Sequence, residues 1–423
     1  MVVTATDTHR AIDAVWRIES ARLIAGLTRI VRDVGIAEEL AQDALLVALE
    51  QWPRGGVPDN PGAWLMATAK NRAIDRLRRG KLLERKHEEL GYELEIEQET
   101  APGIDAGIDD DIGDDLLRLV FIACHPVLST EARVALTLRL LGGLTTEEIA
   151  RAFLLTEPTI AQRIVRAKRT LAEAQVPFEV PRGSELAARL ASVLEVIYLI
   201  FNEGYSATAG DDLMRPALCE DALRLGRMVA ELDPDEAEVH GLVALMEIQA
   251  SRAAARIGPS GEPVLLLDQD RSRWDQLLIR RGLAALERAE HLADTPRTYT
   301  LQAAIAACHA RAHTAGETDW VRIAALYGAL ARSSPSPVIE LNRAVAVSMA
   351  FGPAAGLELA DALLSEPALK NYHLLPTVRG DLLAKLGRAG EARKEFERAA
   401  ALTRNARERE LLLGRAAACA QEN

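Results

Sequence analysis

The sequence is poor in aromatic residues and in cysteine. Phe, Trp and Tyr make up 4% of its 423 residues, and only four cysteines are present. The cysteines are spread along the chain, and none has the near neighbour in sequence that a zinc knuckle or a redox pair requires. We therefore expect no metal, no other cofactor and no disulfide bond. Cys124 precedes His125, and we interpret this doublet as a buried thiol beside a partly buried imidazole.

The sequence also lacks long apolar runs and any strand pattern. No stretch approaches the ~20 apolar residues of a membrane span, and no signal peptide is recognisable at the N-terminus. We expect a cytoplasmic protein that does not contact a membrane. Alternating β-branched residues are missing, whereas Ala, Leu, Arg and Glu are abundant. This composition, with 49% hydrophobic residues, predicts an all-α fold with well-buried cores.

Basic residues are missing from one acidic segment. Between Glu88 and Asp115 there are six Glu and six Asp but no Lys or Arg, so this segment carries the whole formal net charge of −12. The rest of the chain is formally neutral and contains local basic clusters. Residues 83–113 also lose helical periodicity and contain glycine, which predicts a flexible acidic linker.

The most specific pattern is LTTEEIARAFLLTEPTIAQRIVRAKRTL over residues 144–171, which predicts two helices joined by a tight turn. We expect Thr156 to cap the second helix, with Pro158 in its first turn. One side of that helix is apolar, formed by Ile160, Ile164, Ala167 and Leu171. The other side carries Gln162, Arg163, Arg166 and Arg169. Exposed amide and guanidinium groups on a second helix suit a DNA major groove; a solvated surface hairpin is the alternative.

A basic helix is predicted over residues 63–79, AWLMATAKNRAIDRLRR. We expect its inward stripe to contain Ala63, Met66, Ala67, Ile74 and Leu77. The outer face would carry Thr68, Asn71, Arg72, Asp75 and Arg79. Such a helix can be a solvated surface, a membrane binder or a nucleic-acid binder, but its apolar side is too rich in alanine for membrane binding. Residues 36–52 form an earlier amphipathic helix, followed by a break rich in Pro and Gly over 52–62.

Four regions follow from these patterns. We predict a helical domain over 1–82, the acidic linker over 83–113, a helix-turn-helix domain over 114–175, and an α-helical extension over 186–423. Within the extension, Gly316, Gly352 and Gly387 recur at intervals of 36 and 35 residues between amphipathic segments. The segment 382–400 resembles a tetratricopeptide (TPR) unit, so we expect stacked helix pairs that share a continuous core.

The order of these motifs resembles the two-domain bacterial sigma factors of the extracytoplasmic-function (ECF) type. The likeness covers about residues 10–174 and is carried by AEELAQD at 37–43, Trp64, KNRAIDRLRR at 70–79, and the segment 144–171. LEVIYLIFNEGY at 194–205 and DQDRSRWD at 268–275 look like the subgroup with a long helical C-terminal extension.

This resemblance implies binding to the clamp of core RNA polymerase and to promoter DNA. The implied polymerase-binding residues are Glu39, Gln42 and Asp43. The implied −10 residues are Trp64, Asn71, Arg72, Arg76 and Arg79, with a core role as the alternative for Trp64. For the −35 element, the resemblance implies base contacts by Thr159, Gln162 and Arg163, and phosphate contacts by Arg166, Lys168 and Arg169. Pro158 stands where the family usually has glycine, and Ala161-Gln162 replace more polar residues, which leaves the base preference open.

The extension would regulate activity, with a regulatory protein or peptide bound at its TPR-like groove. Three other classes of protein are alternatives to a sigma factor. A helix-turn-helix regulator with a helical sensor domain would bind duplex operator without needing the helix at 36–52. A TPR-type scaffold would use its basic helices only as solvated faces. An enzyme is disfavoured because residues 202–205 and 268–271 have no accompanying nucleophile, phosphate loop or metal-ligand spacing.

Overall fold

The structure, a computed structural model, describes residues 5–88, 108–153, 155–206, 214–259 and 262–421. These residues form helices and contain no strand, only an isolated bridge between Ile257 and Pro263. The α-helices are α1 (Ala5–Val31), α2 (Val34–Gly55), α3 (Pro61–Glu88), α4 (Ile108–Ala123), α5 (Thr130–Leu140), α6 (Thr146–Ala152), α7 (Glu157–Glu173), α8 (Ser184–Tyr205), α9 (Pro216–Leu232), α10 (Ala237–Ala250), α11 (Gln276–Leu292), α12 (Thr298–Arg311), α13 (Trp320–Ser333), α14 (Pro337–Phe351), α15 (Pro353–Ala362), α16 (Leu374–Lys385), α17 (Ala389–Leu402) and α18 (Ala406–Gln421). The all-α prediction is confirmed.

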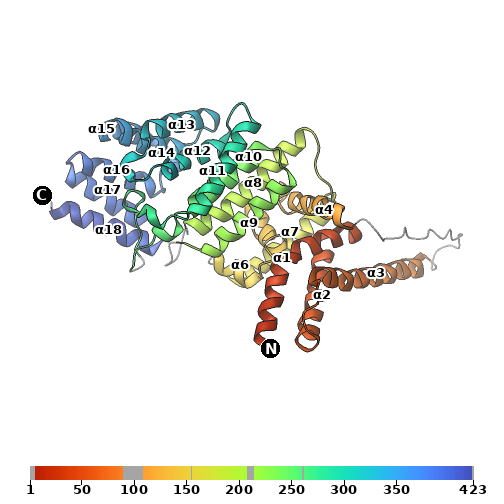
Figure 1. The fold of residues 1–423 in the computed structure, drawn as a ribbon. Coiled ribbons are helices and arrows are strands. Elements are labelled where there is room, and N and C mark those ends of the chain that lie inside the picture. The colour runs from red at the N-terminus through yellow and green to blue at the C-terminus, as the bar shows by residue number, and fades with distance from the viewer. Residues whose placement is uncertain (1–4, 89–107, 154, 207–213, 260–261, 422–423) are drawn as a thin grey trace. The chain divides into compact units, whose positions relative to one another are not determined.

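Contacts divide the chain into two compact units, residues 1–196 and 197–423. In the first unit, α1, α2 and α3 pack on one another as an N-terminal three-helix domain (Figure 1). Alanines at the contact, including Ala41, Ala44 and Ala48, are fully buried and let the helix backbones approach closely. The carboxylate of Asp33 accepts a hydrogen bond from the Ile36 amide at 2.8 Å and so begins α2.

The buried stripe of α3 differs from the predicted one. Met66 and Ile74 are half-buried, but Ala63 and Ala67 are exposed. The fully buried positions are instead Leu65, Ala69 and Ala73. Helix α3 packs against both α1 and α2, so these two helices together determine which side of α3 is buried. Periodicity alone does not distinguish between alanines on neighbouring faces of the helix.

The predicted linker is helical at both ends. Helix α3 continues to Glu88 and α4 begins at Ile108, so residues 83–88 and 108–113 belong to helices. Each end continues the amphipathic helix of the adjoining domain, which overrides the local charge. Residues 89–107, the remainder of the predicted linker, lie outside the described residues.

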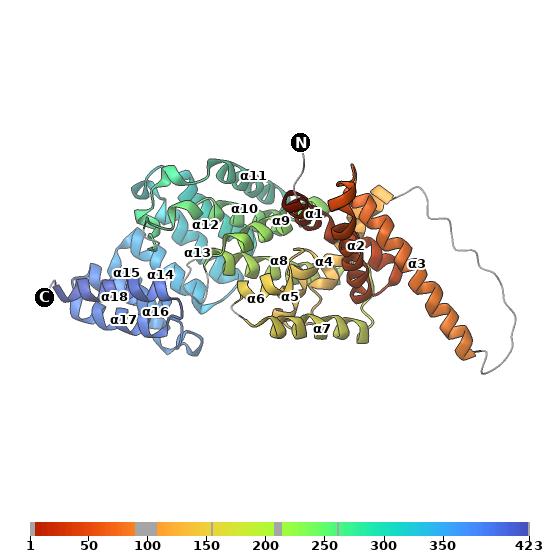
Figure 2. The same ribbon diagram turned by 90° about the horizontal axis from the view of Figure 1, so that it is seen from below.

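The helix-turn-helix domain comprises α4–α7, and α5 and α6 both pack against α7 (Figure 2). The predicted stripe of α7, with Ile160 at its start and Leu171 at its end, is buried. Thr156 occupies the N-cap position, but its hydroxyl makes no capping bond and lies 2.7 Å from the Thr159 hydroxyl. Gly143 precedes α6 with a φ of +70°, and a Cβ there would lie 2.9 Å from the Ser20 hydroxyl, which explains the glycine.

The start of α8 completes the first unit. Arg189 donates a hydrogen bond to the carbonyl oxygen of Phe121 at 2.9 Å, and the Ser192 hydroxyl donates to that of Cys124 at 2.7 Å. Both residues are buried against the end of α4. The sequence places the start of the extension at residue 186, whereas the contacts keep this part of α8 with the first unit.

The second unit consists of helices that pack in chain order (Figure 1). From α10 to α18 each helix contacts the next, as in a solenoid of helix pairs. Two of the three repeat glycines form the turns of successive pairs with left-handed backbones: Gly352, with a φ of +103°, between α14 and α15, and Gly387, at +74°, between α16 and α17. Gly316 lies in a 3-10 turn instead. No helix within the described ranges is long and apolar enough to cross a bilayer.

Candidate nucleic-acid interface

Helix α7 exposes a polar face opposite its buried stripe. Thr159, Gln162 and Arg166 are exposed, and Arg163 is half-buried. A groove of about 390 Å³ runs between them and the first turn of α5, where Glu131 lies. Hydrogen bonds from its own amide and a neighbouring hydroxyl hold the pKa of Glu131 below its ordinary value, and Arg163 adds to the effect. This recognition face therefore offers hydroxyl, amide and guanidinium donors along one edge of a groove.

Two further residues of α7 that we predicted to contact DNA form ion pairs with acidic side chains. Arg169 donates to Glu173 at 2.6 Å in an exposed pair within the helix. Such pairs contribute at most about 1 kcal/mol, so phosphate can displace the acid. Lys168 is placed differently, because its ammonium group forms an ion pair with Glu38 of α2. Its side chain is only 20% exposed. Lys168 therefore lies on the flank facing α2, apart from the recognition face.

Glu38 is a central residue that the sequence did not reveal. It is 2% exposed and accepts hydrogen bonds from Arg139 at 2.6 Å and Gln42 at 2.5 Å, in addition to its pair with Lys168. The only signal in the sequence was position, since Glu38 shares the buried face of α2 with Ala41. Because Arg139 and Lys168 come from α5 and α7, this carboxylate ties the three-helix domain to the helix-turn-helix domain.

The predicted −10 and polymerase-binding residues face one another across α2 and α3. Arg72 pairs with Asp43 at 2.8 Å, and Arg76 pairs with Glu39 at 3.0 Å. All four side chains are at least 43% exposed. Asn71 is exposed beside them. Acidic and basic residues that we predicted to bind different partners thus pair with one another on one surface.

The remaining −10 residues of α3 are Trp64 in its first turn and Arg79 in its second half. Trp64 is half-buried in its first turn and meets Trp52 edge to face, with ring centroids 5.3 Å apart. It therefore has both a packing contact and an accessible part. The backbone of Arg79 is helical, but its side chain lies outside the described atoms.

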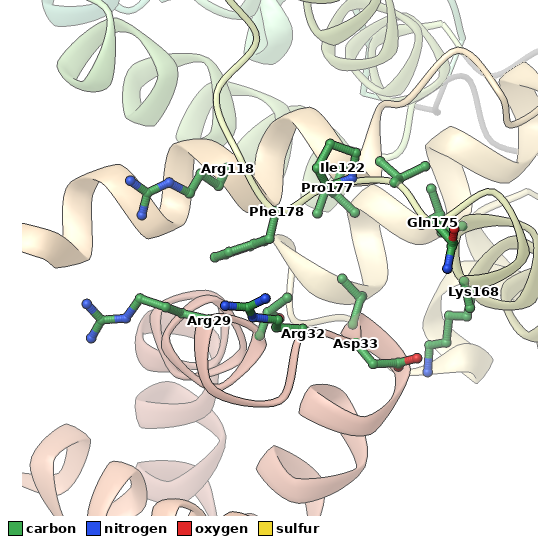
Figure 3. Close-up of a pocket in the computed structure, with 14 residues that line it drawn as sticks. Arg29, Arg32, Asp33, Arg118, Ile122, Lys168, Gln175, Pro177 and Phe178 are labelled. Carbon is green, nitrogen blue, oxygen red and sulfur yellow. The ribbon is translucent and has the colours of Figure 1, made fainter. Parts of the chain in front are cut away.

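A pocket of about 670 Å³ separates the two domains beside the Glu38 contact. In Figure 3, Arg29 and Arg118 extend on the same side of it, and Asp33 and Lys168 point toward one another. The buried carboxylate of Asp115 pairs with Arg29 at 3.1 Å and with Arg118 at 2.6 Å. Ionic contacts therefore surround an open pocket at this part of the boundary between the two domains, while α1 and α4 also pack directly on one another.

The cysteines and His125 offer no catalytic group. All four thiols are free and buried. Burial raises the pKa of Cys124 to about 11, and burial lowers the pKa of His125, which is half-exposed beside it. The interpretation of this doublet as a buried thiol and a partly buried imidazole is confirmed. Across the described residues, no three His, Cys, Asp or Glu side chains gather as metal ligands.

Three family models match the chain. Sigma-70 region 2 matches residues 18–82, and sigma-70 region 4 matches residues 118–171. A family of unknown function, DUF6596, matches residues 189–290. The first two matches fall on the three-helix domain and the helix-turn-helix domain, and the third begins in α8.

Relatives match different shares of the chain. Uncharacterized protein R00370 of Rhizobium meliloti (strain 1021) is 45% identical over 387 residues, which are 91% of this chain and 90% of that protein. ECF RNA polymerase sigma factor SigK of Mycobacterium bovis (strain BCG / Pasteur 1173P2) is 30% identical over 158 residues, which are 36% of this chain and 78% of SigK. SigK of Mycobacterium tuberculosis (strain ATCC 25618 / H37Rv) matches with the same identity and coverage.

Proposed function

The chain belongs to the ECF family of sigma-70 RNA polymerase sigma factors, which direct transcription initiation, and from this premise we propose how its residues divide that task. Members of the family are initiation factors without catalytic activity of their own. They bind core RNA polymerase and promoter DNA. Since the match to R00370 covers 91% of this chain and the match to SigK only 36%, the C-terminal unit needs a separate account.

We propose that α7 reads the duplex −35 element. Thr159, Gln162 and Arg163 contact base edges, and Arg166 and Arg169 contact phosphates. The single observation that carries this assignment is the exposure of these groups on one side of a helix whose opposite side is buried. Lys168 joins the phosphate contacts only after its ion pair with Glu38 is broken.

We propose that α3 meets the melted −10 strand through Trp64, Asn71, Arg72, Arg76 and Arg79. An aromatic ring stacks on an unpaired base, while amide and guanidinium groups bind base edges and phosphates. Support comes from the exposure of the described polar side chains and from the accessible part of Trp64.

We propose that Glu39, Gln42 and Asp43 of α2 face the polymerase clamp. Two of them are the acids paired with Arg76 and Arg72. Basic groups on the clamp would compete for these carboxylates and release both guanidinium groups toward the DNA. Exposed pairs are weak, so the exchange costs about 1 kcal/mol or less per pair. Polymerase binding and −10 binding would then be coupled through shared acids.

The contact at Glu38 makes domain separation a necessary step in this scheme. Lys168 cannot contact a phosphate while its ammonium group is held by Glu38. The pocket beside this contact reduces the apolar area that separation exposes. We propose that the two domains part when the protein seats on polymerase and promoter.

Transcription with purified core polymerase tests the assignment. The full chain, mixed with core polymerase that lacks any sigma factor, is assayed on genomic promoters of its own source. We expect promoter-specific initiation, and its loss when Arg76 or Arg163 is changed to Glu. Arg404→Glu is the matched control, because Arg404 is an exposed arginine of the second unit. Operator binding without polymerase-dependent initiation would support the helix-turn-helix regulator instead.

We propose further that the C-terminal unit regulates initiation, through a regulatory protein or peptide bound at its helical stack. The test removes residues 197–423 and leaves the start of α8 in place, because Arg189 and Ser192 are bonded to α4. We expect the rate of initiation to change. Equal transcription by the truncated and full-length chains would contradict a regulatory role.

A further inference from the structure

The second unit contains a cavity of about 310 Å³ between its helices. Side chains from α8, α10, α12, α13 and α14 line it, together with Arg252, which follows α10. Its apolar lining includes Ile248, Leu266 and Ile305, and polar groups are interspersed among them. The volume is at the low end of the range for small-molecule sites.

Both sequence motifs that the sigma-factor assignment leaves without a role meet beside this cavity. Tyr205 ends the first motif, and its hydroxyl accepts a hydrogen bond from Arg252 at 2.5 Å. Arg256 lies 3.7 Å above the same ring and donates to its backbone carbonyl oxygen. Arg271 and Trp274 come from the second motif, and the Arg271 guanidinium lies 4.9 Å from the Trp274 ring centroid. The motifs thus assemble three arginines around two aromatic rings.

These three arginines are not neutralised by direct ion pairs. None of Arg252, Arg256 and Arg271 forms an ion pair with a carboxylate of the described residues, and their hydrogen-bond partners are hydroxyl and carbonyl oxygens. Glu408 and Glu317 attract Arg256 and Arg271 only from beyond ion-pair distance. Burial lowers the pKa of Arg256 and of Arg271, and the charge of Arg252 lowers both further. Concentrated charge of one sign, partly removed from water, is unfavourable unless an opposite charge joins it.

The cavity wall also holds polar atoms without partners. Nε of Arg252 and Nδ1 of His309 are buried and make no hydrogen bond to the described part of the chain. Both residues line the cavity, and His309 is only 9% exposed. Burial lowers the pKa of His309 to about 4, and Arg252 and Arg271 contribute to the shift. The imidazole is therefore neutral at physiological pH, in a cavity whose potential is positive.

Amide groups complete the polar lining. The Tyr198 hydroxyl donates to Oε1 of Gln302 at 3.0 Å, which leaves the amide nitrogen of Gln302 as a donor. Gln249 and Asn342 also line the cavity. Burial raises the pKa of Tyr327 to about 12, so this lining residue keeps its hydroxyl proton. Hydrogen-bond donors and apolar side chains therefore line the same cavity.

We propose that this cavity binds a small organic acid, with its carboxylate against Arg252 and its hydrocarbon body against Ile248, Leu266 and Ile305. Gln302 and Asn342 donate to the carboxylate from the other side. A monoanion fits better than inorganic phosphate, because much of the wall is apolar and Arg252 is the one cation among the described residues that line it. This site goes beyond promoter recognition and belongs to the C-terminal unit alone.

Calorimetric titration of the full chain tests the site. The probes are phenylacetate, hexanoate and indole-3-acetate at millimolar concentration, with the amide of each acid as the uncharged control and inorganic phosphate as a separate arm. We expect saturable binding of at least one acid, and binding of its amide weaker by about tenfold or more, since a hydrogen bond to a charged group contributes ~1.5–3 kcal/mol.

Three variants locate the binding. Gln302→Glu keeps an acceptor for Tyr198 but places a negative charge beside Arg252, so the fold is retained and acid binding is lost. Ala306→Phe fills the cavity and also abolishes binding. Arg311→Gln, which removes an exposed charge from the same helix, leaves binding unchanged.

Each outcome of these titrations either supports or contradicts the proposed site. Acid binding that Gln302→Glu and Ala306→Phe remove and Arg311→Gln preserves supports the proposal. Absence of binding by all three acids, equal binding of acid and amide, binding of phosphate only, or binding that survives in both cavity variants would overturn it. Circular dichroism of each variant verifies that the helices remain folded.

Discussion

Two charged clusters, one around Glu38 in the first unit and one around Arg252 in the second, are arranged in opposite ways. In the first unit, the carboxylate of Glu38 is surrounded by Arg139 and Lys168, so the buried charges compensate one another. In the second unit, Arg252 and its two arginine neighbours have no carboxylate partner within the described residues. A compensated cluster joins two parts of the same chain, whereas an uncompensated one beside a cavity suits a ligand from outside.

Cationic side chains are also held in two different ways in the two units. Lys168 belongs to the helix that we propose reads DNA but is paired with an acid of another domain, so under this proposal its availability depends on domain separation. Arg252 is held only by neutral oxygen and aromatic groups, which orient a guanidinium without neutralising it. Substitutions that remove charge but keep size should therefore have different effects in the two clusters.

The largest effect is expected from Glu38→Gln. Removing this charge leaves Arg139 and Lys168 near one another without a counter-ion, and breaking a buried pair lowers the free energy of unfolding by about 3–5 kcal/mol. Urea unfolding of the full chain measures the loss. Glu39→Gln is the control, because its pair with Arg76 is exposed and contributes about 1 kcal/mol or less. Equal effects of the two substitutions would refute a central role for Glu38.

A comparable change in the free energy of unfolding is expected when a fall in pH protonates His309. Its pKa is about 4 in the folded chain and about 6.5 in the unfolded chain, so the unfolded state binds the proton first as the pH falls. The free energy of unfolding should therefore decline from about pH 6.5 to about pH 4, by up to about 3 kcal/mol. Above pH 6.5 this contribution is constant. The difference between the wild-type and His309→Gln pH profiles isolates it; identical slopes in the two would contradict the assignment.

A smaller effect is expected from Arg252→Met. This substitution removes a half-buried charge that forms no ion pair with the described residues, and exchange of a buried ion for an apolar side chain is often neutral or stabilising. We expect the free energy of unfolding to change by about 1 kcal/mol or less, against the larger loss for Glu38→Gln. The pKa of His309 should rise, since one of the positive charges that lower it is gone. Histidine proton NMR follows this pKa, and a fall would be the contrary result.

The smallest effect concerns the salt dependence of duplex DNA binding. Each phosphate contact contributes about one unit to the slope of log affinity against log salt. Arg166→Gln should reduce the slope by about one, whereas Lys168→Gln should leave it unchanged while Glu38 is intact. In the Glu38→Gln background, Lys168→Gln should reduce it. Equal reductions by both single substitutions would show that Lys168 is already free.

Sequence patterns were most informative where the apolar residues of a helix fall on one side. The buried stripe of α7, from Ile160 to Leu171, and the exposure of Gln162 and Arg166 followed from helical periodicity. The stripe of α3 was partly wrong because its alanines and larger apolar residues lie on more than one side of the helix, and its packing against α1 and α2 leaves Ala63 and Ala67 exposed. Composition also misplaced the ends of the acidic linker, since amphipathic helices continue into it.

The amino-acid order alone determined the helical class, the two basic helices and the family resemblance, because periodicity and motif spacing are local properties of a chain. Tertiary structure decided that Glu38 pairs with Lys168, that Arg72 and Arg76 pair with Asp43 and Glu39, and that two distant motifs gather three arginines beside a cavity. These contacts join residues from about 30 to more than 100 positions apart, and a charge acquires its partner only when folding brings such segments together.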